Sequence, residues 1–242
     1  MSRIYFPESL SEGARVELPG GAFRHLVQVL RLREGETFTA FDGRGGEYDA
    51  VLVEVGRRAA AARMLAHHAV DRESPLDLTL AQCISKGERM DYSLQKAVEL
   101  GVTRIVPLIS GRSVVRLDEG RWDRKMEHWR GVVVSACEQS GRTRLPVLED
   151  VQALPTWLDD ERAHGERLTL DPHGHHTLRQ LPRPNGPLTL LVGPEGGLSE
   201  GELAHAQRAG FFGIRIGPRT LRTETAGVAA LAALQALWGD WG

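Results

Sequence analysis

The chain has 242 residues, of which 41% are hydrophobic and 26% are charged, a composition typical of a globular protein with one large domain or two modest ones. No apolar run is long enough to span a membrane, and the N-terminus lacks the apolar stretch of a signal peptide, so we expect a cytoplasmic protein without a membrane partner. The formal net charge of −2 excludes a strong overall positive field, so any binding of nucleic acid must depend on local basic patches.

Residues 1–71 predict a small β-rich domain, either a barrel or a sandwich. A turn at Asp42-Gly43 separates the alternating runs "TFTAF" and "EYDAVLVEV", which is a hairpin signal, and "ARVELPG" predicts a further short strand. One short helix fits "GAFRHLVQVLR", where apolar residues recur at helical spacing. The polar, proline-containing segment Asp71–Asp77 then marks the expected domain boundary.

From residue 74 onward, the pattern changes to alternating strands and helices. Ser199, followed three residues later by Glu202, predicts a capping box at the start of one helix, and Gly101 predicts the end of another. The alternation favours an α/β domain with a mostly parallel sheet covered on both faces. The expected strands are "LDLTLAQCIS", "RIVPLIS", "RLTLDP", "PLTLLVG" and "FFGIRIG", and the expected helices are "GERMDYSLQKAVELG", "RWDRKMEHWRGVVVSACEQSG", the one beginning at Ser199 and "TAGVAALAALQALW".

Three loops that contain glycine follow predicted strands, at Gly193–Gly197, Gly217–Arg222 and Asp171–His176. Ligands of parallel sheets bind at the carboxyl ends of the strands, so we expect these loops to line one pocket. No phosphate loop or dinucleotide fingerprint is present. Pro194 removes an amide donor and Glu195 repels phosphate, so a ligand with hydroxyls, amines or a positive centre fits better. The alternative is that "GPEGG" is only a tight structural turn.

The start of the last helix carries a candidate anion site. Arg222 precedes the helix and could hold an anion, and Thr223 is expected to be the N-cap residue. The last helix is apolar around much of its circumference, which predicts either a core helix or a subunit interface.

Histidine and cysteine positions give no metal site. His173, His175 and His176 lie in a Gly/Pro-containing loop without an assigned carboxylate or cysteine partner. Cys83 and Cys137 are far apart and fit no metal spacing, which indicates reduced thiols.

Four segments occur in the order "SKGERMDYSLQKAVELGVTRIVPL", "ACEQSGR", "LVGPEGGLSEGEL" and "IGPRTLRTETA", with "RIYFPE" and "FDG" near the N-terminus. Together they resemble the small-subunit (16S) ribosomal RNA uridine N3-methyltransferase family of the SPOUT superfamily, over the whole chain. The resemblance implies a SPOUT methyltransferase domain over residues 74–242, with a parallel sheet and a C-terminal trefoil knot. It implies a PUA-like β-barrel domain that binds RNA over residues 1–71. Since chains generally avoid knots, physical rules alone would predict a plain doubly wound sheet.

The same resemblance implies the activity and its partners. These are transfer of a methyl group from S-adenosylmethionine to N3 of one uridine of 16S ribosomal RNA in the small ribosomal subunit, by a homodimer that needs no metal. The nearest alternative is a related SPOUT enzyme that methylates a ribose 2'-hydroxyl or another base. Two more distant alternatives are a ribosome-assembly protein that binds RNA without catalysis, and a nucleotide hydrolase, which the absence of a phosphate-loop lysine disfavours.

Carried onto this chain, the resemblance also implies the site residues. Uracil N3 carries a proton, so a general base or a cation that stabilises the anionic ring would help the reaction. The catalytic candidates are Arg222, Glu138, Arg142 and Glu224, and the sequence does not choose between the two glutamates as base. The implied cofactor-binding residues are Leu170, Leu191, Gly193, Pro194, Glu195, Gly196, Ile216, Gly217, Leu221, Arg222 and Thr225. The RNA-binding candidates are Arg3, Arg24, His25, Arg31, Arg33 and Arg142.

Overall fold

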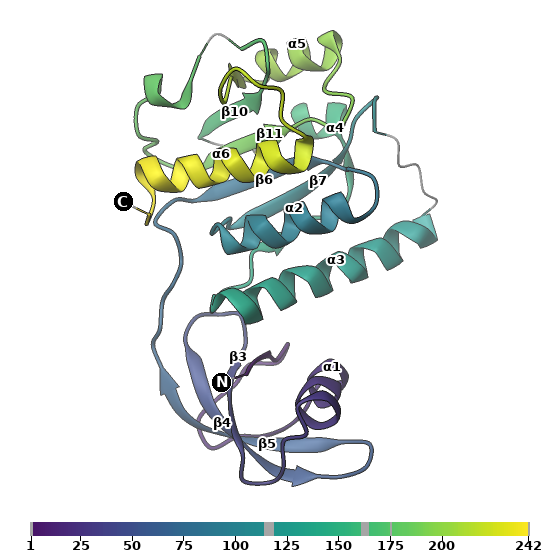
Figure 1. Cartoon of the computed structure of the whole chain (residues 1–242), viewed down its shortest axis with the longest axis vertical. Helices are drawn as coiled ribbons and strands as arrows, with labels where there is room; N and C mark the ends of the chain where they lie inside the picture. The colour runs from purple at the N-terminus through teal and green to yellow at the C-terminus, as the bar shows by residue number, and fades with distance from the viewer. Residues whose placement is uncertain (1, 114–118, 161–164, 175, 242) are drawn as a thin grey trace. The chain divides into compact units, whose positions relative to one another are not determined.

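The computed structural model describes residues 2–113, 119–160, 165–174 and 176–241 (Figure 1). The chain divides into two compact units. The first unit consists of Met1–Glu73 and Val134–Leu145, and the second of Ser74–Val133 and Pro146–Gly242. Helix α3 (Glu119–Ser140) therefore contributes residues to both units, which the sequence pattern did not predict.

The first unit is built on a five-stranded sheet in the order β1-β3-β4-β5-β2. Strand β1 pairs with β3 in parallel, and the remaining neighbours are antiparallel. The predicted hairpin is confirmed as β3 and β4, and the predicted short helix is a single turn, α1, that continues into a π-helix, η1. The bounds are β1 (Arg3–Tyr5), β2 (Arg15–Glu17), α1 (Gly20–Phe23), η1 (Arg24–Val29), β3 (Thr37–Phe41), β4 (Glu47–Val55) and β5 (Ala60–His68).

Alternating side chains of these strands form the core of the first unit. Phe38 and Ala40 of β3, together with Ala50 and Leu52 of β4, are buried with Leu26 of η1. Alternation at a period of two places every second residue of a strand on the same face, so a half-buried sheet follows from this sequence.

The second unit contains a seven-stranded sheet in the order β12-β10-β11-β6-β7-β8, with β9 also paired to β7. All of these pairings are parallel, as predicted. The strands are β6 (Leu78–Cys83), β7 (Arg104–Ile109), β8 (Val147–Leu148), β9 (Gln152–Ala153), β10 (Glu166–Leu170), β11 (Leu188–Val192) and β12 (Phe212–Ile214). The helices are α2 (Glu88–Glu99), α4 (Leu154–Leu158), α5 (Glu200–Arg208) and α6 (Thr223–Trp238), with a 3₁₀ turn η2 (Leu178–Gln180).

Helices cover both faces of this sheet. Helices α2 and α6 pack against each other and lie in front of it in Figure 1. On the other face, Leu154 of α4 and Ala206 of α5 share a core with Ala81, Val106 and Leu191 of the sheet. The carboxyl ends of β10, β11 and β12 therefore meet at one edge, because the three strands are parallel neighbours. The trefoil knot that the resemblance implies stays a prediction.

The starts of α5 and α6 can be compared with the capping residues predicted from the sequence. The capping box of Ser199 and Glu202 is confirmed, since each side chain accepts a hydrogen bond from the backbone N–H of the other residue. The expectation that Thr223 is an N-cap residue is wrong. Arg222 occupies the N-cap position without a side-chain cap, and Thr223 is the first helical residue. Its hydroxyl instead donates to the carbonyl oxygen of Gly193 at 2.6 Å.

Among the described residues, no helix combines the length and the apolar character that crossing a membrane requires.

Candidate functional site

A cavity of about 900 Å³ lies at the carboxyl ends of β10, β11 and β12 in the second unit. The three loops singled out in the sequence all contribute to its lining, so the expectation that they share one pocket is confirmed. They contribute Leu170–His173, Gly193–Leu198 and Arg215–Glu224, respectively. Parallel strand order, rather than closeness in sequence, brings these loops together.

The loop Gly193–Gly197 is held in place by contacts from outside it. The carboxylate of Glu195 accepts hydrogen bonds from the backbone N–H of Lys86 and from Nη1 of Arg89, each at 3.0 Å. On the other side, Nη1 of Arg112 donates to the carbonyl oxygen of Gly196 at 2.9 Å. Together with the bond from the Thr223 hydroxyl to Gly193, these contacts fix the loop before any ligand binds.

The ionisation of Glu195 follows from the same contacts. Burial alone would raise the pKa of Glu195, but hydrogen bonds from Lys86 and Arg89 and the Arg89 charge outweigh it and hold the pKa below the ordinary value. The carboxylate is thus ionised at neutral pH. Its charge is paired with Arg89, and the loop itself presents a carboxylate rather than a cation, which agrees with the prediction that a phosphate does not belong in this loop.

Gly193 is needed because a larger residue at this position would crowd Leu198, at the other end of the same loop. A Cβ atom on Gly193 would lie 3.1 Å from the backbone nitrogen of Leu198 and 3.2 Å from its Cγ. Both distances are tighter than ordinary van der Waals contact, so even alanine would press on the loop itself. Gly217, in the third loop, has a φ of 87°, a left-handed conformation that favours glycine.

A group of charged side chains gathers at one wall of the cavity. Arg89 lies between two carboxylates, because its Nη1 contacts Glu195 and its Nε lies 3.9 Å from Oε1 of Glu224. The other carboxylate oxygen of Glu224, Oε2, is buried without a hydrogen-bond partner in the described part of the chain. Arg222 also lines the cavity. A buried acceptor without a partner can take a proton or a hydrogen bond from a ligand.

The structure places most of the expected cofactor-binding residues at the cavity. Two do not line it: Leu191 is fully buried in the core beneath the loop, and Thr225 is exposed in the first turn of α6. Leu191 points into the core because it is on the sheet face covered by α4 and α5. The lining residues from the expected set are Leu170, Gly193, Pro194, Glu195, Gly196, Ile216, Gly217, Leu221 and Arg222.

The catalytic candidates divide between the units. Arg222 and Glu224 line the cavity in the second unit, whereas Glu138 and Arg142 belong to the first unit. Glu138 accepts a hydrogen bond from the backbone N–H of Tyr5 at 3.0 Å, and burial raises its pKa. The side chain of Arg142 is only 5% exposed and is paired with Glu73. Arg142 is therefore engaged within its own unit.

The RNA-binding candidates of the first unit also differ in exposure. Arg3 is paired with Glu47 and donates to the carbonyl oxygen of Arg142 at 3.1 Å. The other four candidates are exposed, and two exposed apolar side chains, Val29 and Leu30, lie among them in the chain. The exposed candidates are Arg24, His25, Arg31 and Arg33.

Sequence reasoning missed three basic residues of the cavity: Arg89, Arg112 and Arg215. Arg89 lies in the quoted segment "SKGERMDYS", but its partner Glu195 is 106 positions away, and no local pattern predicts such a pairing. Of the three histidines, His173 lines the cavity, His176 forms a bridge with Ile214, and His175 lies outside the described residues.

Comparisons with known proteins agree with this arrangement. The model of the RNA methyltransferase domain family matches residues 72–235, and that of the RNA methyltransferase PUA domain matches residues 18–65. Ribosomal RNA small subunit methyltransferase E of Buchnera aphidicola subsp. Schizaphis graminum is 32% identical over 238 residues, which cover 98% of this chain and 97% of the relative. Its counterpart in Mycobacterium bovis is 32% identical over 247 residues, with 100% and 94% coverage.

A solved structure extends the similarity to three dimensions. The crystal structure of ribosomal RNA small subunit methyltransferase E from Neisseria gonorrhoeae bound to S-adenosyl methionine superimposes with a TM-score of 0.93. The two chains are 43% identical, and the match covers 100% of each. With family models and relatives that span nearly its full length, this chain belongs to the RNA methyltransferase family of ribosomal RNA small subunit methyltransferase E.

Proposed function

We propose that the protein methylates N3 of one uridine in 16S ribosomal RNA, with S-adenosylmethionine as the methyl donor. The observation that carries this proposal is the cavity itself. Its three loops are in place at the carboxyl ends of parallel strands, in a chain similar over its full length to an enzyme crystallised with S-adenosyl methionine. The small ribosomal subunit is the proposed context and the cytoplasm the proposed location.

The residues of the cavity suit this cofactor. Leu170, Ile216 and Leu221 offer apolar surface for an adenine ring, and the glycine loops offer backbone groups for its edges. When bound, S-adenosylmethionine supplies a methyl group activated by a sulfonium.

Two residues at the cavity are proposed to act on the uracil. The carboxylate of Glu224 accepts the N3 proton, because its Oε2 is buried, without a partner among the described residues, and adjacent to the cavity. Arg222 stabilises the negative charge that the ring gains as that proton leaves. Glu138 and Arg142 have their side chains engaged within the first unit, which favours structural roles for both.

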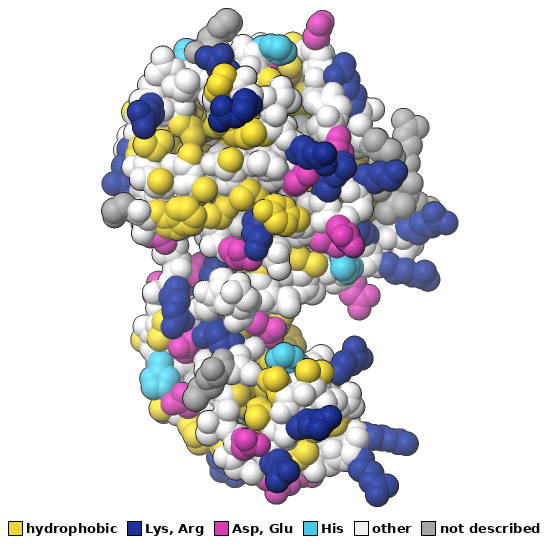
Figure 2. Space-filling view, in the orientation of Figure 1, with side chains coloured by type: hydrophobic (Ala, Val, Ile, Leu, Met, Phe, Trp, Pro, Cys, Tyr) yellow, Lys and Arg dark blue, Asp and Glu magenta, His cyan; other side chains and the backbone are white. Residues whose placement is uncertain are grey.

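The protein is also proposed to act as a homodimer through α6. Helix α6 buries Ala230, Leu231 and Leu234 against its own unit. It leaves Leu237 42% exposed, and Trp241, just beyond the helix, 58% exposed. Figure 2 shows hydrophobic side chains gathered in a band over this helix. Exposed apolar surface of this kind is typical of an interface.

The test uses purified protein and small subunits from cells that lack the gene. Reaction with S-adenosylmethionine is expected to create one primer-extension stop at a uridine, because N3 methylation blocks base pairing. A 2'-O-methyl group does not block pairing, so incorporation of methyl without a stop would favour the alternative acceptor. Glu224→Gln is expected to reduce turnover by about 100-fold or more while cofactor affinity stays unchanged. Glu200→Gln, an exposed glutamate of α5, is the matched control.

A further inference from the structure

A second surface in the second unit combines aromatic and basic side chains beside the cavity. We call it the edge surface, because β12 is the last strand in the order of the sheet. The edge surface consists of His176, Arg179, Phe212 and Arg215, all of which are exposed.

Backbone contacts place two segments of the chain, which carry these four residues, side by side. His176 forms a parallel bridge with Ile214, and the N–H of Arg215 donates to the carbonyl oxygen of His176 at 2.8 Å. Arg179 follows three residues later, in η2. The loop before His176 is also fitted tightly to β12, because a Cβ atom on Gly174 would lie 3.0 Å from the carbonyl oxygen of Gly213. Gly174 and His176 therefore lie against β12 and extend the edge of the sheet.

The edge surface combines an exposed apolar side chain with exposed basic side chains. The Phe212 side chain is 56% exposed although it is fully apolar. In the described part of the chain, neither Arg179 nor Arg215 is paired with a carboxylate, whereas Arg89, Arg104 and Arg130 each have such a partner. An exposed ring and unpaired guanidinium groups along one edge of the sheet suit a ligand that offers both flat apolar faces and negative charge.

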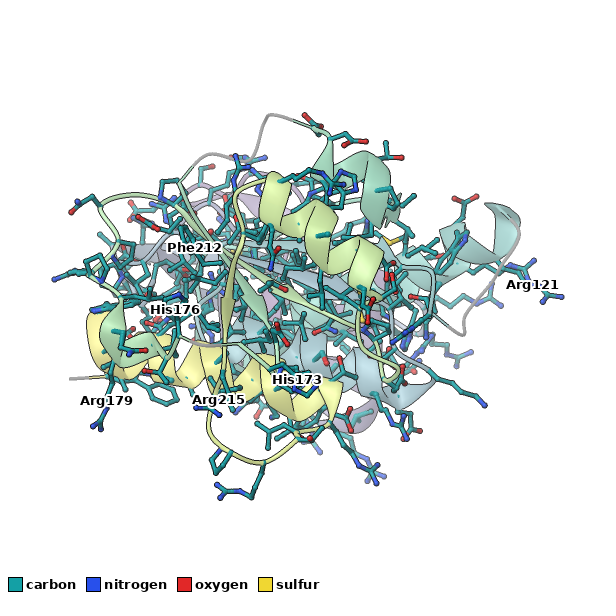
Figure 3. The ribbon with its side chains drawn as sticks, turned by 90° about the horizontal axis from the view of Figure 1, so that it is seen from above. Arg121, His173, His176, Arg179, Phe212 and Arg215 are labelled. Atoms are coloured by element: carbon teal, nitrogen blue, oxygen red, sulfur yellow. The ribbon has the colours of Figure 1, made fainter. Side chains whose placement is uncertain are left out.

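The edge surface is continuous with the cavity. Arg215 lines the cavity and is the first residue after β12, and His173, two residues before the undescribed position 175, lines it as well. Figure 3 shows Phe212, His176, Arg179 and Arg215 toward one side of the view, with Arg121 at the opposite end. A chain that places one nucleotide in the cavity would therefore pass its neighbours across this surface.

We propose that the edge surface binds the single-stranded nucleotides that flank the target uridine in ribosomal RNA. One base stacks on the ring of Phe212, and backbone phosphates pair with Arg179 and Arg215. A base that is modified at N3 must be unstacked and unpaired, which leaves its neighbours unstacked as well. This inference rests on the proposed function, since it assumes an RNA substrate at the cavity.

The chemistry favours RNA over a protein partner or a second copy of the chain. A protein interface centred on Phe212 would be expected to place several apolar side chains around it. The residues that accompany it here are two arginines and a histidine, and phosphates complement them directly. Stacking of a base on one aromatic ring needs no further apolar surface.

The test measures binding of a short fluorescein-labelled oligouridylate and of 16S ribosomal RNA by the full-length protein at several salt concentrations. Phe212→Ala is expected to weaken RNA binding by about fivefold to a hundredfold without changing the salt dependence, and Phe212→Tyr is expected to restore it. Arg179→Ala is expected to reduce the slope of log affinity against log salt by about 0.7, the value for one lost phosphate contact on a single strand. Arg121→Ala, which removes the same charge at the opposite end of the unit, is the control and is expected to leave affinity and slope unchanged.

The outcomes distinguish this inference from the proposed function. Binding of S-adenosylhomocysteine and methylation of small subunits are measured on the same preparations. If the unaltered protein shows neither, the proposed function fails, and the inference fails with it. If the unaltered protein shows both, while Phe212→Ala and Arg179→Ala match it in RNA affinity and salt slope, only the proposal that the edge surface binds RNA is overturned. A change in sedimentation of Phe212→Ala with unchanged RNA affinity would assign the surface to a second copy of the chain and would also overturn it.

Discussion

Glu195 is a carboxylate in a glycine-rich loop, and its contacts explain why the loop accommodates it. The sequence predicts that Pro194 and Glu195 disfavour a phosphate, and the structure adds the reason for the glutamate. Its carboxylate ties the loop to the start of α2, through the backbone of Lys86 and the guanidinium of Arg89. The sequence could not show this, because a pairing across 106 positions leaves no periodic or local signal.

The first prediction concerns the ion pair between Glu195 and Arg89. Glu195→Gln keeps the shape of the side chain and removes its charge, so the bond to Arg89 weakens and the loop loses order. We expect affinity for S-adenosylhomocysteine, measured by calorimetry, to fall roughly threefold to tenfold, which corresponds to about 0.6–1.4 kcal/mol. The free energy of unfolding should fall by less than about 1 kcal/mol, because the side chains of the pair are 42% and 25% exposed and solvent screens them.

Glu149→Gln provides the control for this prediction. Glu149 pairs with Arg104 in the same unit, at similar exposure, and does not line the cavity. Its replacement should leave cofactor affinity unchanged. Equal affinities for Glu195→Gln and the unaltered protein would show that the tie to Arg89 does not organise the loop.

At the scale of the element, the first residue of α6 does not cap its own helix but contacts a loop that lines the cavity. Thr223 donates its hydroxyl to the carbonyl oxygen of Gly193 at 2.6 Å and accepts a bond from Nε2 of Gln82 at 3.1 Å. Threonine near a helix start ordinarily predicts an N-cap. Here the hydroxyl is engaged by tertiary contacts to β6 and to the loop after β11, and sequence alone does not reveal such competitors.

Two isosteric substitutions test how much the hydrogen bond from Thr223 to Gly193 contributes to the free energy of unfolding. Thr223→Val leaves the carbonyl of Gly193 without its donor, and we expect unfolding in urea to show a loss of about 1–3 kcal/mol. Thr169→Val is the matched comparison, because the hydroxyl of Thr169 is buried without a hydrogen-bond partner in the described structure. Thr169→Val should leave the free energy of unfolding unchanged or raise it, since a polar group without a partner is replaced by an apolar group of the same shape. Equal losses for the two variants would contradict the assignment.

Secondary structure was predictable where the sequence carried a clear period or cap. The longer helices and the other strands of the second unit, the β3–β4 hairpin and the capping box of α5 all follow from such patterns. The two-residue strands β8 and β9 and the single turn of α4 are too short to have a period. The assignment of Val134–Leu145 to the first unit depends on contacts distant in sequence, such as that between Tyr5 and Glu138.

For the whole molecule, the sequence predicted which loops form the site, but not all the charges within it. Parallel strand order is inferable from strand–helix alternation, and it brings the three loops to one edge. The arginines that line the cavity come from α2, from the loop after β7 and from the loop after β12. Their positions depend on the angles between packed elements, which no local pattern specifies.

The last prediction concerns assembly through α6. The exposed apolar side chain of Leu237 would be buried in a homodimer, so Leu237→Glu would place a charge in the interface at a cost that favours separate chains. Sedimentation equilibrium is expected to give twice the chain mass of 26.6 kDa for the unaltered protein and a shift toward the single-chain mass for the variant. Leu65→Glu, a change at a leucine of β5 that is 40% exposed, should leave the mass of the dimer unchanged. A single-chain mass for the unaltered protein, or an unshifted mass for Leu237→Glu, would contradict assembly through this helix.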